Sequence, residues 1–251
     1  MSAPASTSIR WPLATFINMG TVSLGSFLGL SLQQTFPPEV QSIVFYTIGL
    51  GTLVLGMQMS LRMPEGYLLV FFFSLILGGI SGELLSIDDW LHQLGERVKG
   101  GLHIEDSAFS EGLITAFLIF CIGSVTIIGA IEEGLKGRRE LLLIKSVLDG
   151  FTAIALAASY GLGVWFSILP MLLFQGGLTV LAGSLRPLLR PRRIALLGAV
   201  GGALILGIGI NMLQLADLPL ENMLPALLLL FPLAYIAERS GLIGLLLRRK
   251  D

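Results

Sequence analysis

The chain has 251 residues with a formal net charge of −1; 54% of them are hydrophobic and 13% charged, and the mean hydropathy is +0.84. A soluble domain carries about 25% charged residues, so this composition excludes an ordinary water-soluble fold and predicts a chain surrounded by lipid. The single cysteine, Cys121, excludes an internal disulfide and a cysteine-rich metal site, and the absence of a basic patch with interleaved aromatic residues argues against a nucleic-acid partner.

Eight stretches are long and apolar enough to cross a bilayer, which requires about 20 mostly apolar residues in a helix. Segment 86–110, between the third and fourth stretches, has apolar residues near helical spacing and predicts an amphipathic helix on the outer membrane surface. The fold class is therefore all-α, a polytopic transmembrane bundle that forms a single domain over residues 1–251. The predicted spans, in chain order, are 11–32, 40–61, 66–85, 111–134, 141–160, 164–185, 194–213 and 222–237.

Two features of these spans need comment. Only the sequence "GLG" at 161–163 separates the fifth span from the sixth, so a count of seven is the alternative. The first span follows a segment with one basic residue and no convincing cleavage site, which predicts a retained helix and not a signal peptide.

The distribution of basic residues predicts the orientation. With eight crossings and the N-terminus inside, 14 of the 16 Lys and Arg residues fall on the cytoplasmic side, and only Arg97 and Lys99 lie outside. Cytoplasmic loops are enriched in Lys and Arg, so both termini are predicted to be cytoplasmic. The lipid bilayer is the expected partner.

Similar motifs near the two ends of the chain suggest an internal repeat. "GTLVLGMQMSL" from Gly51 resembles "GALILGIGINML" from Gly202, and the third and eighth spans both end in a small residue followed by an acid, Glu83 and Glu238. Spans 1–3 would then match spans 6–8 in the opposite orientation, the inverted repeat of many secondary transporters. Chance matching of low-complexity Gly/Leu/Ile segments is the alternative, and GxxxG spacings are explained by close helix packing alone.

The fifth span contains the clearest charged pair inside the predicted membrane. Lys145 and Asp149 are four residues apart, on one helical face, and Asp149 lies about 12 Å below the start of the span at Leu141. Charged groups near the bilayer centre cost about 2.5–3.5 kcal/mol even on insertion scales. Asp149 is therefore the first candidate for a solute or ion site, although a pair that only packs helices explains it equally well.

Two adjacent carboxylates, Glu132 and Glu133, end the fourth span. Adjacent positions on a helix point about 100° apart, so one acid can face the bundle while its neighbour faces water. They are candidates for a cytoplasmic-side cation or proton path together with Asp149, or they simply mark the end of the helix. Uncharged polar groups in other spans are candidate ligands or interhelical hydrogen-bond partners: Asn18, Gln58, Gln175 and Asn211.

Three stretches, "FCIGSVTIIGAIEEGL", "KSVLDGFTAIALAASYGLGVWFSILPMLLFQGGLTVLAG" and "GGALILGIGINML", resemble a bacterial inner-membrane family known as domain of unknown function 554. The resemblance runs from about Leu13 to Ala237. In that family the position of Glu132 is often an amide and that of Glu133 an acid, which implies that Glu133 is the functional member of the two. The resemblance implies an integral membrane protein and no particular substrate.

The favoured function is transport of a small solute or ion, with a proton or Na⁺ among the candidates; the alternative is a membrane scaffold or assembly partner with no transport activity. No nucleophile–base set, HExxH, GxSxG or phosphate loop occurs, so neither an enzyme nor a cofactor or metal is expected. A homo-oligomer is left open.

Overall fold

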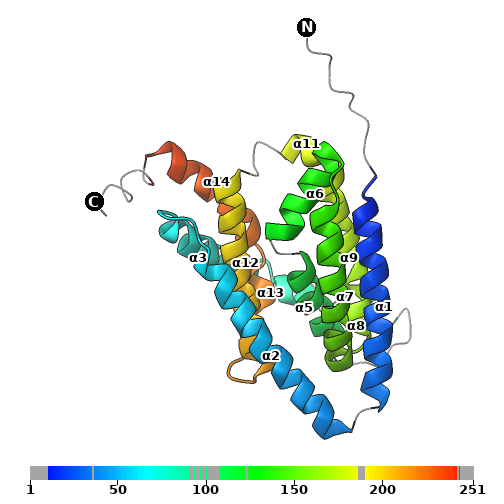
Figure 1. Ribbon diagram of the computed structural model, residues 1–251. Helices are drawn as coiled ribbons and strands as arrows, with labels where there is room; N and C mark the ends of the chain where they lie inside the picture. Colours follow the sequence, from blue (N-terminus) through cyan, green and yellow to red (C-terminus); the bar gives the residue numbers. More distant parts are fainter. Residues whose placement is uncertain are drawn as a thin grey trace.

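The computed structural model describes residues 11–35, 37–90, 108–121, 124–185 and 190–241, and the single positions 93, 97, 100 and 243. Its helices form two groups that lie side by side (Figure 1). We call the group of α1 and α5–α11 the α1 bundle, and the group of α2, α3 and α12–α14 the α12 bundle. The helices are α1 Leu13–Thr35, α2 Pro38–Leu61, α3 Leu68–Leu84, α5 Phe109–Cys121, α6 Ser124–Lys136, α7 Glu140–Tyr160, α8 Leu162–Phe166, α9 Ile168–Met171, the π-helix η1 Leu172–Gly176, α10 Gly177–Val180, α11 Ala182–Leu185, α12 Pro191–Met212, α13 Leu220–Met223 and α14 Ala226–Arg239.

The predicted all-α polytopic bundle is confirmed, since the described residues contain helices and no strand. Six helical segments are long and apolar enough to cross a membrane, and a seventh is obtained when α5 and α6 count as one bent span. The remaining predicted span is α3, an apolar helix of 17 residues that is only about 25 Å long. Each predicted span thus corresponds to a helix or a series of helices.

Two spans are discontinuous. The fourth consists of α5 and α6, which are inclined by 61° to each other. The sixth is divided into α8, α9, η1, α10 and α11, with a π-helical turn in the middle. A π-helix inserts one extra residue into the turn and is frequently found at functional sites.

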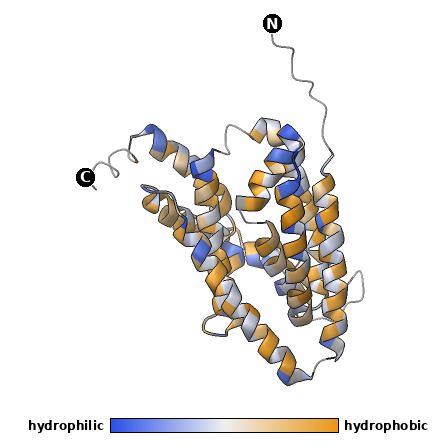
Figure 2. Ribbon diagram, viewed as in Figure 1, coloured by the Kyte–Doolittle hydropathy of each residue, from blue (hydrophilic) through white to orange (hydrophobic). Residues whose placement is uncertain are grey.

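Large apolar side chains are exposed on both bundles, and the hydropathy colouring of the ribbon shows that hydrophobic residues predominate in both (Figure 2). Examples are Leu24 on α1, Val54 on α2 and Phe151 on α7, which are 68%, 69% and 69% exposed. Exposed apolar surface of this extent is costly in water, whereas lipid tolerates it. Hydrophilic residues instead lie at the upper end in the view of Figure 2 and inside the molecule near α13.

Glycines set the closest helix contacts. A Cβ atom at Gly25 or Gly29 of α1 would overlap backbone oxygens of α7, and one at Gly82 of α3 would overlap the backbone oxygen of Asn222. Gly56 of α2 and Gly202 of α12 meet in the same way. Small residues let membrane helices approach closely, and α1 accordingly packs along α7, and α2 along α12.

The start of α1 and the end of α14 lie at the upper end of the molecule in Figure 1, as does the turn between α6 and α7. The two ends of a chain lie on the same side of a membrane when the chain crosses it an even number of times, as the eight predicted spans require. Which end faces the cytoplasm stays a prediction. Most of the predicted amphipathic segment 86–110, including Lys99, lies outside the described residues, as do the stretches 186–189 and 244–251 with Arg186 and Arg248.

Candidate functional site

Four polar side chains from three segments meet inside the α1 bundle, and we call them the Asp149 cluster: Asn18 of α1, Lys145 and Asp149 of α7, and Gln175 of η1. Asn18 Nδ2 donates to Asp149 Oδ2 at 2.9 Å and to Gln175 Oε1 at 3.2 Å. Lys145 Nζ forms an ion pair with the same Asp149 oxygen. The side chains of Lys145 and Asp149 are only 10% and 8% exposed, and Asn18 and Gln175 are fully buried.

Local structure explains how each member reaches the cluster. Lys145 and Asp149 are one helical turn apart on α7 and therefore share a face. Gly150 adds no side chain between α7 and α1, so Asn18 comes within hydrogen-bond distance of Asp149. Gln175 lies in the π-helical turn, where the altered helical phase turns its side chain toward α1.

Two atoms of the cluster have no hydrogen-bond partner, namely the acceptor Asn18 Oδ1 and the donor Gln175 Nε2. Leaving a buried polar atom unpaired costs about 1–3 kcal/mol, so such atoms are usually satisfied. Seven buried side-chain atoms among the described residues lack a partner, and all seven belong to the α1 bundle: Thr15 Oγ1, Asn18 Oδ1, Ser26 Oγ, Glu133 Oε2, Tyr160 OH, Trp165 Nε1 and Gln175 Nε2.

The end of α5 packs beside the cluster, because Cys121 shares one buried core with Ala153 of α7 and with Met171, whose sulfur accepts a hydrogen bond from Asn18 Nδ2 at 3.5 Å. After the break between α5 and α6, the buried Thr126 hydroxyl donates to the Phe120 carbonyl at 3.1 Å and so satisfies a group released by the interruption. Two discontinuous spans therefore flank the ion pair, one at Cys121 and one at Gln175.

Glu133 and Glu132 have different surroundings. Glu133 is fully buried, and its Oε1 accepts the backbone N–H of Ala14 at 3.1 Å and the Arg139 Nε–H at 2.8 Å. A carboxylate is favourable at the first turn of α1, where backbone N–H groups are unsatisfied. Glu132 points outward and forms a weak pair with Lys136 at 3.9 Å. Of the two acids, only Glu133 reaches the interior.

The remaining predicted candidates lie away from the cluster. Gln58 is exposed on α2. Asn211 closes the loop after α12, where its Nδ2 donates to the Leu218 carbonyl and its Oδ1 accepts the Leu218 N–H, each at 2.9 Å. The sequence of a single apolar helix does not show which of its faces turns toward the other helices. For α2 and α12 it therefore could not show that Gln58 and Asn211 lie outside the cluster that Asn18 and Gln175 join.

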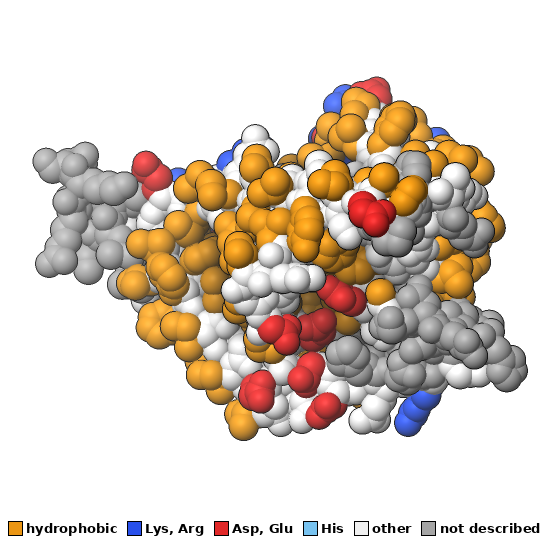
Figure 3. Space-filling view, turned by 90° about the horizontal axis from the view of Figure 1, so that it is seen from below, with side chains coloured by type: hydrophobic (Ala, Val, Ile, Leu, Met, Phe, Trp, Pro, Cys, Tyr) orange, Lys and Arg blue, Asp and Glu red, His pale blue; other side chains and the backbone are white. Residues whose placement is uncertain are grey.

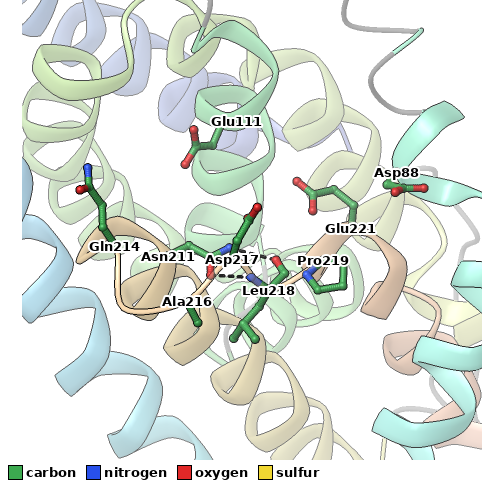
Figure 4. A pocket seen from close by; sticks show the side chains of 9 residues that line it. All are labelled: Asp88, Glu111, Asn211, Gln214, Ala216, Asp217, Leu218, Pro219 and Glu221. Atoms are coloured by element: carbon green, nitrogen blue, oxygen red, sulfur yellow. Dashed lines mark hydrogen bonds between the residues drawn. The ribbon is translucent and has the colours of Figure 1, made fainter.

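A pocket of about 760 Å³ opens at the lower end of the molecule. Figure 3 shows acidic side chains gathered on this face, and Figure 4 shows those of the pocket on its rim and walls. Its carboxylates are Asp88 after α3, Glu111 on α5, Asp217 after α12 and Glu221 on α13. The described residues contain no group of three or more His, Cys, Asp or Glu that could hold a metal ion.

The sequence interpretation did not select the pocket acids as site residues. The signal was present, because all four lie at or just beyond the ends of spans predicted to face the same side of the membrane. It was weak, since a carboxylate at a span end is the ordinary mark of the water boundary.

Three further interactions were also missed. Two of them join α3 and the residue before it to the last span, and the third joins α12 to the last span. Asn222 Nδ2 donates to Glu83 Oε2 at 2.8 Å. Tyr67 OH donates to Glu238 Oε1 at 2.9 Å. Arg193 contacts both oxygens of Glu238, through Nε at 3.1 Å and Nη2 at 2.6 Å.

Comparison with known proteins agrees with the architecture. The family model described as "Protein of unknown function (DUF554)" matches residues 13–235. The chain is 30% identical over 230 residues to the uncharacterized membrane protein YdfK of Bacillus subtilis (strain 168), covering 91% of this chain and 98% of the relative. It is also 30% identical over 227 residues to the uncharacterized protein YqgA of Escherichia coli (strain K12), covering 88% of this chain and 96% of the relative. No solved structure matches. The protein is a multi-pass membrane protein, and the chain belongs to the DUF554 family.

Proposed function

We propose that the protein is a transporter that binds a small solute or ion at the Asp149 cluster. The observation that carries the proposal is the pair of unpartnered atoms, Asn18 Oδ1 and Gln175 Nε2, beside a buried ion pair. A bound solute would supply the missing hydrogen bonds and offset the cost of burying these atoms in lipid surroundings.

The interrupted helices support this proposal. Solute sites of secondary transporters are typically built where membrane helices are broken, near the middle of the bilayer. Here the break after Cys121 lies in the same buried core as Met171, which contacts Asn18, and the π-turn contains Gln175 itself. Asp149 lies nine residues into α7, or about 13 Å from its start, which agrees with a site well inside the membrane.

The inverted repeat is part of the proposal, and reciprocal contacts support it. Glu83 and Glu238 are 155 positions apart. Tyr67, which bonds to Glu238, and Asn222, which bonds to Glu83, are also 155 positions apart. The bond from Asn222 to Glu83 is therefore the counterpart of the bond from Tyr67 to Glu238. A pseudo-twofold axis that exchanges α3 with α13 and α14 requires such an exchange of partners, and a chance resemblance between apolar segments does not.

Two more observations agree with this axis. Pro64 and Pro219, which precede α3 and α13, are also 155 positions apart. Asn18 and Gln175 occupy matching places in the first and sixth spans and are hydrogen-bonded to each other. Residues that are exchanged by a twofold axis and also touch must lie next to it, so the proposed axis would pass the Asp149 cluster.

In this proposal the acidic pocket is the entrance from the outer side, and Glu133 lies on the exit path toward the cytoplasm. Glu133 accepts hydrogen bonds from the backbone N–H of Ala14 and from Arg139. In this proposal these bonds keep the upper end of the path closed in the observed conformation. The protein would reside in the bacterial plasma membrane with both termini in the cytoplasm. Reporter fusions within 137–140 should then read cytoplasmic, and a fusion near residue 106 should read external; the reverse pattern would contradict this orientation.

A scaffold without transport activity is the second candidate, and one observation favours it. The Asp149 cluster joins α1 to α7, a closely packed helix pair, so its hydrogen bonds could serve assembly alone. The two functions differ in what the carboxylate charge of Asp149 does.

The test is a flux measurement on purified protein in liposomes, with protons, Na⁺, K⁺ and a panel of amino acids, sugars and carboxylic acids. Asp149→Asn should reduce flux at least tenfold in protein that still inserts and purifies, with a melting temperature lowered because Lys145 loses its buried partner. Glu132→Gln, which removes a carboxylate from an exposed pair, is the matched control and should retain flux. A loss of yield and thermal stability in Asp149→Asn, with no wild-type flux of any tested solute, would favour the scaffold.

A further inference from the structure

The charge balance of the Asp149 cluster restricts which solute it can hold. The cluster contains one cation, Lys145, and one anion, Asp149, and no other charged group bonds to either of them among the described residues. Its net charge is therefore zero. Adding a single Na⁺ or a single carboxylate would leave an uncompensated charge in the membrane interior, which costs several kcal/mol.

The unpartnered atoms point to the same conclusion, because one is an acceptor and one is a donor. Asn18 Oδ1 can only accept hydrogen bonds, and Gln175 Nε2 can only donate them. The bond to Asp149 fixes the Asn18 amide, because an ionised carboxylate can only accept and therefore requires Nδ2 there. The same Nδ2 then requires the acceptor Oε1 of Gln175 opposite it, which leaves Nε2 as the unpartnered atom. A solute that satisfies both atoms must offer a donor and an acceptor.

We propose that the ligand of the Asp149 cluster is a small zwitterion, an α-amino acid or a close analogue, which inserts between Lys145 and Asp149. Its carboxylate takes hydrogen bonds from Lys145 Nζ and Gln175 Nε2, while its ammonium group donates to Asp149 and Asn18 Oδ1. Each charge of the solute then meets the opposite charge, and the net charge of the site stays zero. This inference rests on the proposed function for its setting, but it concerns binding and can be tested without flux.

The surroundings suit the ammonium end of such a solute. The described residues that line the lower pocket include four carboxylates and no Lys or Arg. An acidic cleft raises the local concentration of positively charged groups, so a zwitterion would arrive there with its ammonium group held by the pocket. Glu111 at the pocket and Cys121 at the cluster are on the same helix, ten residues or about 15 Å apart.

The experiment measures ligand charge preference in four proteins: the wild type, Lys145→Met, Asp149→Asn and the control Lys136→Met. Detergent-purified protein is first dialysed to equilibrium against an equimolar mixture of the twenty standard amino acids at pH 7, and bound molecules are quantified by mass spectrometry. The amino acid bound most strongly is then compared with its decarboxylated amine and its deaminated carboxylate.

We expect the wild type and Lys136→Met to prefer the amino acid over both analogues at least tenfold. Lys145→Met leaves Asp149 alone and should prefer the amine, whereas Asp149→Asn leaves Lys145 alone and should prefer the carboxylate. A purely structural ion pair would not make ligand preference follow the remaining charge.

Two outcomes would overturn the inference: retention of none of the twenty amino acids by the wild type, or loss of binding in both variants without a change of charge preference. Binding that follows the charges without any flux would contradict the proposed transport while supporting the zwitterion site. Flux of a metal cation or proton that depends on Asp149, with no amino-acid binding, would support the proposed transport and contradict the zwitterion site.

Discussion

Buried polar groups are handled differently in the two bundles. In the α12 bundle, Glu238 is bonded to both Tyr67 and Arg193, and Asn222 is bonded to Glu83. In the α1 bundle, seven buried side-chain atoms have no hydrogen-bond partner among the described residues, and two of them belong to the Asp149 cluster. Both bundles use glycines for close packing, so the contrast is one of polar chemistry and not of helix packing.

The difference indicates a division of labour. Fully satisfied polar groups stabilise a fixed arrangement, whereas partly satisfied ones cost free energy unless something else completes them. The α12 bundle therefore has the character of a frame, and the α1 bundle that of a binding element. Four experiments test this comparison between the two bundles.

The largest effect is expected from a clash in the frame. Gly82→Leu places a side chain where the backbone oxygen of Asn222 lies, and backbone cannot move aside cheaply, so the cost should be on the order of 3 kcal/mol or more. The yield of monodisperse protein should fall to a small fraction of the wild-type level. Gly51→Leu, at an exposed glycine with no atom within 4 Å of the added Cβ, should leave the yield unchanged. Equal behaviour of the two variants would contradict the close α3–α13 contact.

Removing the buried cation of the frame should cost about 3 kcal/mol, the lower part of the range for breaking a buried ion pair, because Glu238 stays 23% exposed. Arg193→Met leaves Glu238 with Tyr67 and the distant Arg190 only. The melting temperature in detergent should fall by several degrees. Arg190→Met, whose side chain is 68% exposed and 3.9 Å from Glu238, is the control and should shift it little. A drop of equal size in both would show that the bidentate geometry of Arg193 is unimportant.

A matched pair of substitutions compares the bundles directly. Asn222→Leu leaves Glu83 and the Asp88 N–H without their bonds and should destabilise the protein by about 1–3 kcal/mol. Gln175→Met removes an unpartnered donor and a single accepted bond, so its stability loss should be at most about 1 kcal/mol. Gln175→Met should, however, reduce solute binding at least tenfold. The reverse ranking in thermal melts would mean that the α1 bundle is the frame.

The smallest effect concerns an unpartnered hydroxyl. Thr15 is fully buried and its Oγ1 has no partner, so Thr15→Val replaces a polar atom with a methyl group of similar shape. We expect stability to be unchanged or raised by up to about 1 kcal/mol. The measurement is the melting temperature, and a fall of several degrees would show that the hydroxyl is satisfied in the membrane by a water or lipid group. Ser74→Ala, which removes a hydroxyl that donates to the Val70 carbonyl at 2.6 Å, provides the comparison.

Parts of the site followed from local sequence. The pairing of Lys145 with Asp149 needs only a helix and a spacing of four, and both are local properties. The depth of Asp149 followed from the position where the apolar run begins. The contacts of Asn18 with Asp149 and with Gln175 did not follow, because these partners are 131 and 157 positions away from it and the π-turn that orients Gln175 leaves no recognisable mark in the sequence.

The sequence by itself determined that the chain is a helical membrane protein, where its spans lie and that a charged pair is buried in one of them. Lipid cannot hydrogen-bond to a backbone, so each crossing must be a helix with a long apolar run, and such runs can be read directly. Only the tertiary structure decided that Glu133 faces inward and Glu132 outward, that Gln58 and Asn211 stay apart from the Asp149 cluster, and that Glu83 and Glu238 find reciprocal partners. These outcomes depend on how far each helix is rotated about its axis. Contacts between glycines and backbone atoms of distant segments set that rotation, and hydrophobic runs carry no information about it.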